Sequence, residues 1–296
     1  MAVAAPSLST SPQTLLSREA ELRVRFDPRS SFARVVDIVA SIFRQIWYVI
    51  VTWSYHLFGP EQQFCGMQIT WNADSKALVV GAYGTKSRPS AFLEQHSLLA
   101  AHPNIDVFIP RVPHGGACSL EDAAQPILDH VLDYILYHPS NPVCFIGASN
   151  GGRLNMWMET ELRVRHPGTP VMVSNIAGAH LGTSRMNLLR SLGIADWWFP
   201  SVFVDELSLN SEKAQWLLRR VRQALPEGCA PRKYDFAATV DDLIVPNLES
   251  SIPDIGDHLQ VANPIVVSGH SHDSLIAAVA EQQVRRVVAW IQEFQS

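Results

Sequence analysis

The sequence contains one serine in a setting that favours a role as a nucleophile. Ser149 lies in the string GASNG at residues 147–151, which follows the apolar run VCFI at residues 143–146. A Gly-x-Ser-x-Gly string between a buried strand and a helix is typical of a sharp turn that holds the serine hydroxyl clear of a sheet. The pattern also arises by chance as a glycine-rich strand-to-helix turn, so its meaning depends on the rest of the chain.

A serine nucleophile needs two further side chains. Its hydroxyl is weakly nucleophilic at neutral pH, so a base must take the proton and a carboxylate must orient that base. Asp241 and Asp242 follow one predicted strand, and His270 and His272 follow the last one. Both loops are expected at the carboxyl ends of strands, where open α/β sheets place their sites. The residues alone leave either aspartate and either histidine open, and an Asx turn or a helix cap is the alternative role for an aspartate there.

The elements that would position these residues alternate along the chain from residue 66 onward. Short apolar runs predict strands, and the helical stretches between them predict βαβ units around a mostly parallel, doubly wound sheet of the α/β class. The expected strands are residues 67–71, 77–82, 106–111, 143–146, 170–176, 234–239 and 264–268, and the expected helices between and after them are residues 91–101, 119–137, 151–165 and 273–294.

One long interval interrupts this alternation. Between the predicted strands that end near Ile176 and begin at Tyr234 lies an apolar cluster that includes Trp197 and Trp198, followed by a helix-like run. An insertion on the active-site side of such a sheet is typical of a lid, and its aromatic residues suit an apolar substrate. We expect a helical lid at about residues 183–230; the alternative is that these residues simply cover the sheet.

Composition favours a single globular unit that acts on a small molecule. The 296 residues are 47% apolar, which is enough for one large core, and we expect one domain at residues 66–296. The net charge of −5 and the absence of a basic stripe argue against a nucleic-acid partner. No phosphate or dinucleotide loop and no zinc spacing occur, so no metal or cofactor is expected. The four cysteines are widely spaced, and we interpret them as reduced thiols: Cys65, Cys118, Cys144 and Cys229.

The first sixty residues divide into two parts. Residues 1–30 begin without the basic and apolar regions of a secretory signal, and we expect them to be disordered. Residues 31–60 are apolar and aromatic, but Asp37 and Arg44 keep the uncharged run below the roughly 18 residues of a membrane span. Two interpretations of Val35 to Phe58 stay open: an interfacial helix in peripheral contact with a membrane, or a helix packed on the protein's own core or a partner subunit. We expect an intracellular protein, either cytoplasmic or peripherally membrane-associated.

Several strings resemble those of the α/β-hydrolase superfamily, in particular its lipase-like esterases, from about residue 67 to the C-terminus. The resemblance selects Asp242 over Asp241 as the acid and His272 over His270 as the base. Beyond the serine turn, the matching strings are IAGAHLGT at residues 176–183 (similar to Thr-Pro-His-x-Gly-Ser/Thr), DLIVP at 242–246 (Asp-x-Ile-Val-Pro) and HDSLI at 272–276 (His-x-x-Leu-Leu).

The resemblance implies hydrolysis of a carboxylic ester through an acyl-enzyme. Ser149 would attack the ester carbonyl, His272 would pass the serine proton to the leaving alcohol, and Asp242 would orient the ring. The expected substrate is a small-molecule lipid or other acyl ester. Two alternatives stay open: an acyltransferase that uses the same three residues, and a non-catalytic binding module with the same fold.

The resemblance also implies two backbone donors for the oxyanion. One is the N–H of Asn150, the residue after the nucleophile. The other comes from the loop after the strand at residues 77–82, where His-Gly is usual in the family. Here the string is GAYG at residues 81–84, so the expected donor is the N–H of Tyr83.

Overall fold

A parallel β-sheet forms the centre of the molecule. The computed structural model describes residues 12–58 and 71–294. In this described part, seven strands are ordered β2-β1-β3-β4-β5-β6, with β7 also paired to β5, and each pairing is parallel. The expected α/β class with a doubly wound sheet is confirmed. The strands are β1 (Ala77–Ala82), β2 (Ile105–Phe108), β3 (Val143–Ala148), β4 (Val171–Ile176), β5 (Arg232–Thr239), β6 (Gln260–Val261) and β7 (Ile265–Val267).

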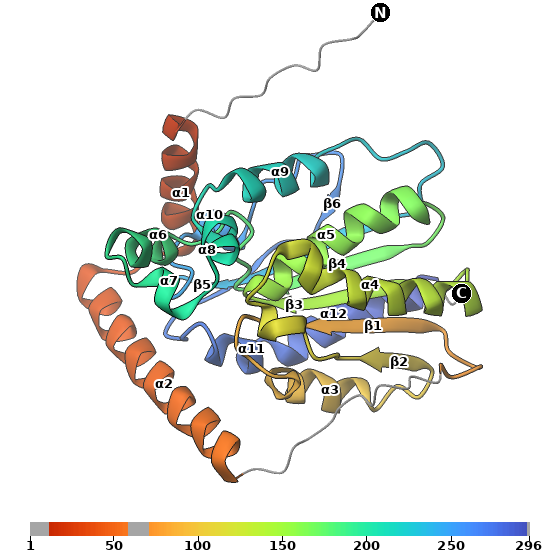
Figure 1. The fold of residues 1–296 in the computed structure, drawn as a ribbon, viewed down its shortest axis with the longest axis horizontal. Helices are drawn as coiled ribbons and strands as arrows, with labels where there is room; N and C mark the ends of the chain where they lie inside the picture. Colours follow the sequence, from red (N-terminus) through yellow and green to blue (C-terminus); the bar gives the residue numbers. More distant parts are fainter. Residues whose placement is uncertain (1–11, 59–70, 295–296) are drawn as a thin grey trace, which may run out of the picture.

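Helices cover both faces of this sheet. Helices α3 and α12 pack together on one face, and α4 and α5 pack together on the other (Figure 1). Strands β1 and β3 between them are buried at every residue, which is why their sequences are continuous apolar runs rather than alternating ones. The helices are α3 (Leu93–Leu99), α4 (Leu120–Tyr137), α5 (Asn150–Arg165), α10 (Leu248–Ser251), α11 (Ser274–Ala278) and α12 (Ala280–Gln292), with short 3-10 helices η1 (Pro89–Phe92) and η2 (Pro113–Gly116).

The expected elements differ from the observed ones at a few places. The predicted strand at residues 67–71 lies outside the described residues except for Trp71, which is not in a strand. Strand β6 was not predicted because it is two exposed residues long and carries no pattern. The helix predicted at residues 273–294 is divided at Val279 into α11 and α12.

The long interval between β4 and β5 is helical. Its first three helices form a small core of their own with the loops after β4 and β5, whereas the fourth packs against α5 as part of the core around the sheet. Trp197 and Trp198 are not part of this core and lie at the surface, with 87% and 66% of their area exposed. The helices are α6 (Ser184–Ser191), α7 (Ala195–Trp198), α8 (Ser201–Leu207) and α9 (Glu212–Val221).

The N-terminal region forms two helices, α1 (Pro12–Phe26) and α2 (Ser31–Phe58). The expectation of disorder up to residue 30 therefore differs from the structure at residues 12–26. The reason is a contact far along the chain: the Arg23 guanidinium donates hydrogen bonds to the carbonyl oxygens of Val240 (3.0 Å) and Pro246. Within the described residues, no helix combines the length and apolarity that crossing a membrane requires.

Candidate active site

Ser149 occupies the turn between β3 and α5. Its backbone has φ 55° and ψ −125°, a region that residues other than glycine rarely adopt. The turn is also tightly packed: a Cβ atom at Gly151 would lie 1.8 Å from the carbonyl oxygen of Ala82 in β1. Glycine is therefore required at position 151, and the serine is held in a strained conformation at the carboxyl end of a central strand.

Asp242 and His272 are hydrogen-bonded to each other. Both side chains are buried, and His272 Nδ1 lies 2.7 Å from Asp242 Oδ2. The other carboxylate oxygen, Oδ1, accepts the backbone N–H groups of Ile244 and Val245, both at 2.8 Å. Because β5 and β7 are parallel neighbours in the sheet, the loops that follow them lie side by side at the carboxyl ends of the strands. With Nδ1 committed to Asp242, Nε2 is the ring atom that remains for proton exchange.

The adjacent candidates, Asp241 and His270, make different contacts. The Asp241 carboxylate accepts the N–H of Gly269 at 2.6 Å and pairs with Arg29 from the N-terminal region. The carbonyl oxygen of His270 accepts a hydrogen bond from the Thr239 hydroxyl at 3.0 Å, and its ring faces Ser274 rather than a carboxylate. The geometry thus pairs Asp242 with His272, the residues that the sequence resemblance selects.

Ser149 and His272 lie at the same end of the sheet but are not hydrogen-bonded to each other. Among the described residues, no hydrogen bond joins the Ser149 hydroxyl to the His272 ring. Contacts of this kind are often long without substrate and tighten only in the reacting complex. Ser149, Asp242 and His272 share the carboxyl edge of the same sheet, following β3, β5 and β7, but their joint action remains a prediction.

The loop after β1 contacts the serine through Gly84. A Cβ atom at Gly84 would lie 2.8 Å from the Ser149 Cβ and 3.2 Å from its Oγ, so only glycine allows this approach. The hydroxyl of Tyr83 accepts the N–H of Val112 at 2.8 Å, which anchors the loop. Sequence reasoning named Tyr83 and passed over Gly84, although a glycine just after a central strand is a signal for close backbone approach. The Tyr83 N–H as an oxyanion donor remains a prediction.

Asn150 lies at the first position of α5. The N–H groups of a helix's first turn have no acceptor within the helix, which suits the Asn150 N–H to stabilise negative charge. The Asn150 side chain is fixed on both sides: its Nδ2 donates to the carbonyl oxygen of Gly116 in η2 at 3.2 Å, and its Oδ1 accepts from Arg153 at 3.2 Å. The glycine-rich η2 loop is therefore a neighbour of the serine turn.

Arg153 and His180 form a buried polar pair close to the serine turn. Arg153 Nη2 lies 4.0 Å from a carboxylate oxygen of Glu206 in α8. Burial lowers the pKa of Arg153 to about 10, although the charge of Glu206 opposes the shift. Burial and the nearby Arg153 charge lower the pKa of His180 to about 3. His180 is therefore neutral, and its edge-to-face contact with Phe236 fits a packing role rather than a proton-transfer role.

The charge state of His272 depends on its partner. Burial disfavours the protonated ring, but the Asp242 charge and hydrogen bond outweigh it and raise the pKa of His272 from 6.5 to about 9. A base must be neutral to accept a proton, so the kcat/KM of a reaction in which His272 is the base is expected to rise with pH and level off above about 9. In Asp242→Asn the rise should move to lower pH, while activity falls by about 10⁴-fold because the ring loses its orienting carboxylate. A pH–rate profile of both proteins checks this, and identical midpoints would contradict it.

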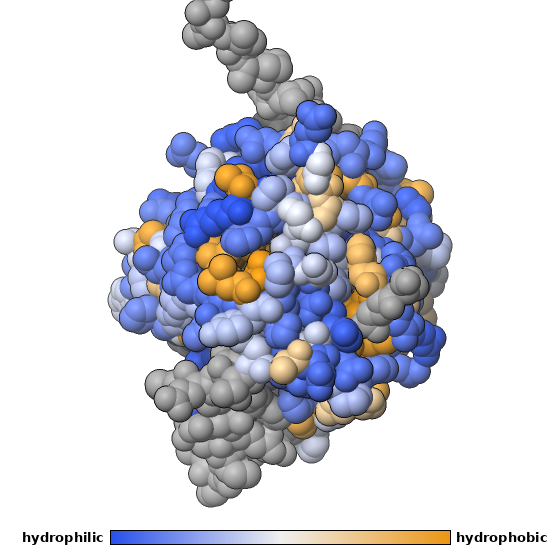
Figure 2. Space-filling model, turned by 90° about the vertical axis from the view of Figure 1, so that its right-hand side faces the viewer, coloured by the Kyte–Doolittle hydropathy of each residue, from blue (hydrophilic) through white to orange (hydrophobic). Residues whose placement is uncertain are grey.

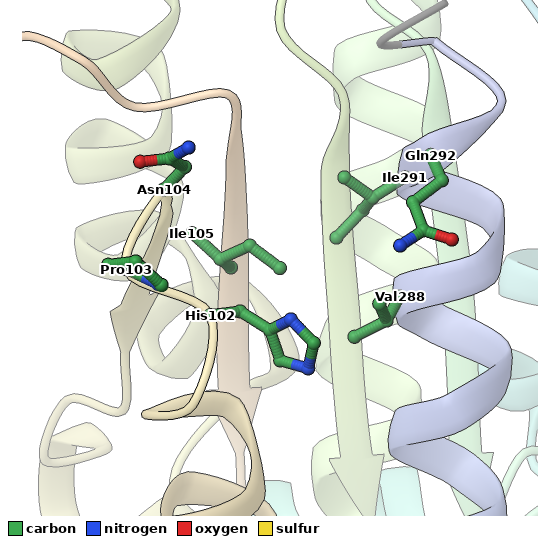
Figure 3. Close-up of a pocket in the computed structure, with 7 residues that line it drawn as sticks. All are labelled: His102, Pro103, Asn104, Ile105, Val288, Ile291 and Gln292. Carbon is green, nitrogen blue, oxygen red and sulfur yellow. The ribbon is translucent and has the colours of Figure 1, made fainter.

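One cavity is distant from these residues. It measures about 120 Å³ and opens where the start of β2 meets the end of α12, at the amino ends of the strands (Figure 3). Ser149, Asp242 and His272 lie at the opposite edge of the sheet, so this cavity is not part of the candidate site. The cavity is lined by His102, Pro103, Asn104, Ile105, Val288, Ile291 and Gln292.

In the described ranges, no three His, Cys, Asp or Glu side chains are grouped as metal ligands.

Comparison with known proteins defines the fold. No protein-family model and no curated protein match the chain. A solved structure from work on LipS and LipT, two metagenome-derived lipolytic enzymes, superimposes with a TM-score of 0.51 at 15% identity, covering 74% of this chain and 94% of that one. Est1E from Butyrivibrio proteoclasticus gives 0.50 at 13% identity, covering 74% and 90%. The chain has the α/β-hydrolase fold. Within that fold it is similar to lipase-like and esterase structures.

Proposed function

We propose that the protein is a serine hydrolase that cleaves carboxylic esters, with Ser149 as nucleophile, His272 as base and Asp242 as the acid that orients it. The observation that carries the proposal is the buried hydrogen bond between His272 and Asp242 at the same sheet edge as the strained Ser149 turn. Ion pairs with a purely structural role also shift the pKa of histidines. Here, however, the His272–Asp242 pair occurs together with a strained backbone at Ser149, which a purely structural turn does not need.

In this mechanism His272 Nε2 takes the proton of the Ser149 hydroxyl as its oxygen attacks the ester carbonyl. The carbonyl π bond opens, and the negative charge on its oxygen is stabilised by the N–H groups of Asn150 and Tyr83. The C–O bond to the alcohol then breaks, and His272 returns its proton to the leaving oxygen. Water attacks the acyl-enzyme by the same route, releasing the acid and restoring Ser149.

The proposed substrates have an apolar acyl group. The helices α6 to α9 form a lid in this proposal, because they are an insertion in the sequence between β4 and β5 and present exposed Trp197 and Trp198. The test is a series of p-nitrophenyl esters from acetate to palmitate. We expect turnover of all, with kcat/KM highest for medium or long chains. No turnover of any chain length by folded protein would contradict the hydrolase, and transfer to an added alcohol with little free acid would identify the acyltransferase alternative.

We further propose that α2 contacts a lipid surface. Its outward positions are apolar through most of residues 32–47, and Phe43 and Trp47 are 68% and 67% exposed. Apolar patches of this extent are rare on surfaces that meet only water. Helix α2 and the α6–α7 region lie on one side of the molecule (Figure 1), whereas the face toward the C-terminus is mainly hydrophilic, with apolar residues in small groups (Figure 2).

A double substitution on α2 tests the lipid contact. The variant Phe43→Glu with Trp47→Glu should lose most co-flotation with phospholipid vesicles, because two charges would have to enter the interface. It should keep the kcat/KM of the unmodified protein on a soluble short-chain ester. Leu136→Glu is the matched control, because Leu136 is 74% exposed on α4, and it should float normally. Equal flotation of all three proteins would favour the interpretation that α2 packs on protein.

A further inference from the structure

Helix α2 contacts the body of the protein through polar side chains. Asp37, Ser41 and Gln45 are spaced four residues apart, which places them along one edge of the helix. This edge faces the loops after β5 and β7, whereas Phe43 and Trp47 are exposed. A helix that docked only to bury apolar surface would have the opposite orientation. The contact between α2 and the body is therefore specific and polar.

The loop that carries Asp242 is held at the preceding residue. Arg29, which lies between α1 and α2, makes two hydrogen bonds to the Asp241 carboxylate, from Nη1 to Oδ2 at 2.9 Å and from Nη2 to Oδ1 at 3.0 Å. The Ser41 hydroxyl donates to the Asp241 carbonyl oxygen at 2.9 Å. The N-terminal region thus fixes both the side chain and the backbone carbonyl of Asp241, the residue before Asp242.

The loop that carries His272 is held by the same helix edge. The Ser41 hydroxyl also lies 3.3 Å from the carbonyl oxygen of His270, so one buried hydroxyl faces both loops. The Gln45 amide donates to the carboxylate of Asp273 at 2.6 Å. The first contact holds the backbone two residues before His272, and the second holds the side chain of the residue after it.

The carboxylate of Asp241 joins the two loops. Its Oδ2 accepts the N–H of Gly269 at 2.6 Å while the same carboxylate pairs with Arg29. Arg29 also pairs with Asp27 and Asp37, so one guanidinium compensates three carboxylates. Asp27 also pairs with Arg34, so loss of the Arg29 guanidinium would chiefly remove the positive partner of the buried Asp241 carboxylate, and an unpaired buried charge is costly. The loops would be expected to move apart or to admit water.

We propose that three side chains of the N-terminal segment, Arg29, Ser41 and Gln45, position the loops of Asp242 and His272, and that Arg29 is the central positioning residue. The inference rests on the proposed function, since it gives this segment a role in the same site. Arg29 does not touch reacting atoms; it acts through Asp241. Proton transfer by His272 depends on its 2.7 Å contact with Asp242, and a displacement of about 1 Å costs on the order of 10²-fold in rate.

Arg29→Gln in the full-length chain tests the proposal. On a soluble p-nitrophenyl butyrate, kcat should fall by about 10- to 100-fold with KM nearly unchanged, because substrate contacts are intact while the acid–base pair is displaced. Arg29→Lys should recover only part of this loss, because lysine keeps the charge but cannot form two parallel hydrogen bonds. Arg25→Gln removes the same charge from an exposed site on α1 and should match the unmodified protein.

A spectroscopic readout separates positioning from general stability. The proton on His272 Nδ1 should give a low-field NMR resonance that Asp242→Asn abolishes; Arg29→Gln should shift or broaden it, and Arg25→Gln should not. If Arg29→Gln fails to fold, Ser41→Ala, which removes one hydroxyl, takes its place as the test variant. Its kcat and its low-field NMR resonance are then compared with those of the unmodified protein. Unchanged kcat and an unmoved resonance in the folded variants would overturn the proposal. Absence of ester turnover by the unmodified protein would instead refute the proposed function, and the resonance would still report on the positioning.

Discussion

Replacing Ser149 with alanine is expected to lower kcat for ester hydrolysis by about 10⁴-fold or more, because no acyl-enzyme can form without the hydroxyl. The substitution removes a single oxygen from a turn whose shape is set by Gly151 and by Gly84, so the thermal midpoint should stay close to that of the unmodified protein. Steady-state kinetics on a p-nitrophenyl ester, together with a thermal melt, measure both quantities.

Two companion variants sharpen this expectation. Ser191→Ala removes an exposed hydroxyl on α6 that donates to the Leu188 carbonyl within the same helix, and it should leave kcat unchanged. The double variant Ser149→Ala with His272→Ala should be no slower than either single variant, because residues that act as a unit are not additive. Retention of activity in Ser149→Ala would exclude this serine as the nucleophile.

The second large effect is expected at His272. His272→Ala should lower kcat/KM by about 10⁴-fold, since it removes both the base and the partner of Asp242. His270→Ala is the matched comparison two residues away, and it should cost less than about tenfold because its ring lies against Ser274 rather than against a carboxylate. Kinetics of the two variants on one ester check the assignment, and the reverse ranking would show that the wrong histidine was chosen.

The sheet was predictable because its central strands are buried on both faces. Burial in a parallel sheet requires continuous apolar runs, and VCFIGA in β3 and ALVVGA in β1 are of this kind. The two-residue strand β6 was not predictable, because pairing with β5 rather than composition defines it. The break at Val279 was also missed, because the apolar periodicity continues across it into α12.

The residues of the candidate site that lie within short characteristic strings could be predicted from the sequence. The serine turn has a short sequence signature, and the resemblance to lipase-like strings separated Asp242 from Asp241 and His272 from His270. The contacts that hold these residues were not predictable in the same way. Gly84 acts through backbone proximity to Ser149, which leaves no signature beyond the glycine itself.

The role of the N-terminal region was the largest omission. Disorder was expected for residues 1–30, because the chain begins with small and polar residues, yet Arg23 and Arg29 bind loops more than 200 positions away. Long-range polar contacts of this kind have no local pattern. One signal was available: Asp37, Ser41 and Gln45 recur every four residues on a mainly apolar helix, which indicates a polar side of the helix with a partner.

The central claim is that Ser149 is an activated nucleophile. It is tested most directly by incubating the folded protein with a fluorophosphonate probe and locating the adduct by peptide mass spectrometry. We predict a single adduct on Ser149, absent in Ser149→Ala and formed far more slowly in His272→Ala, because the probe needs a deprotonated serine oxygen. No adduct on folded protein, or an adduct confined to another serine, would contradict the account.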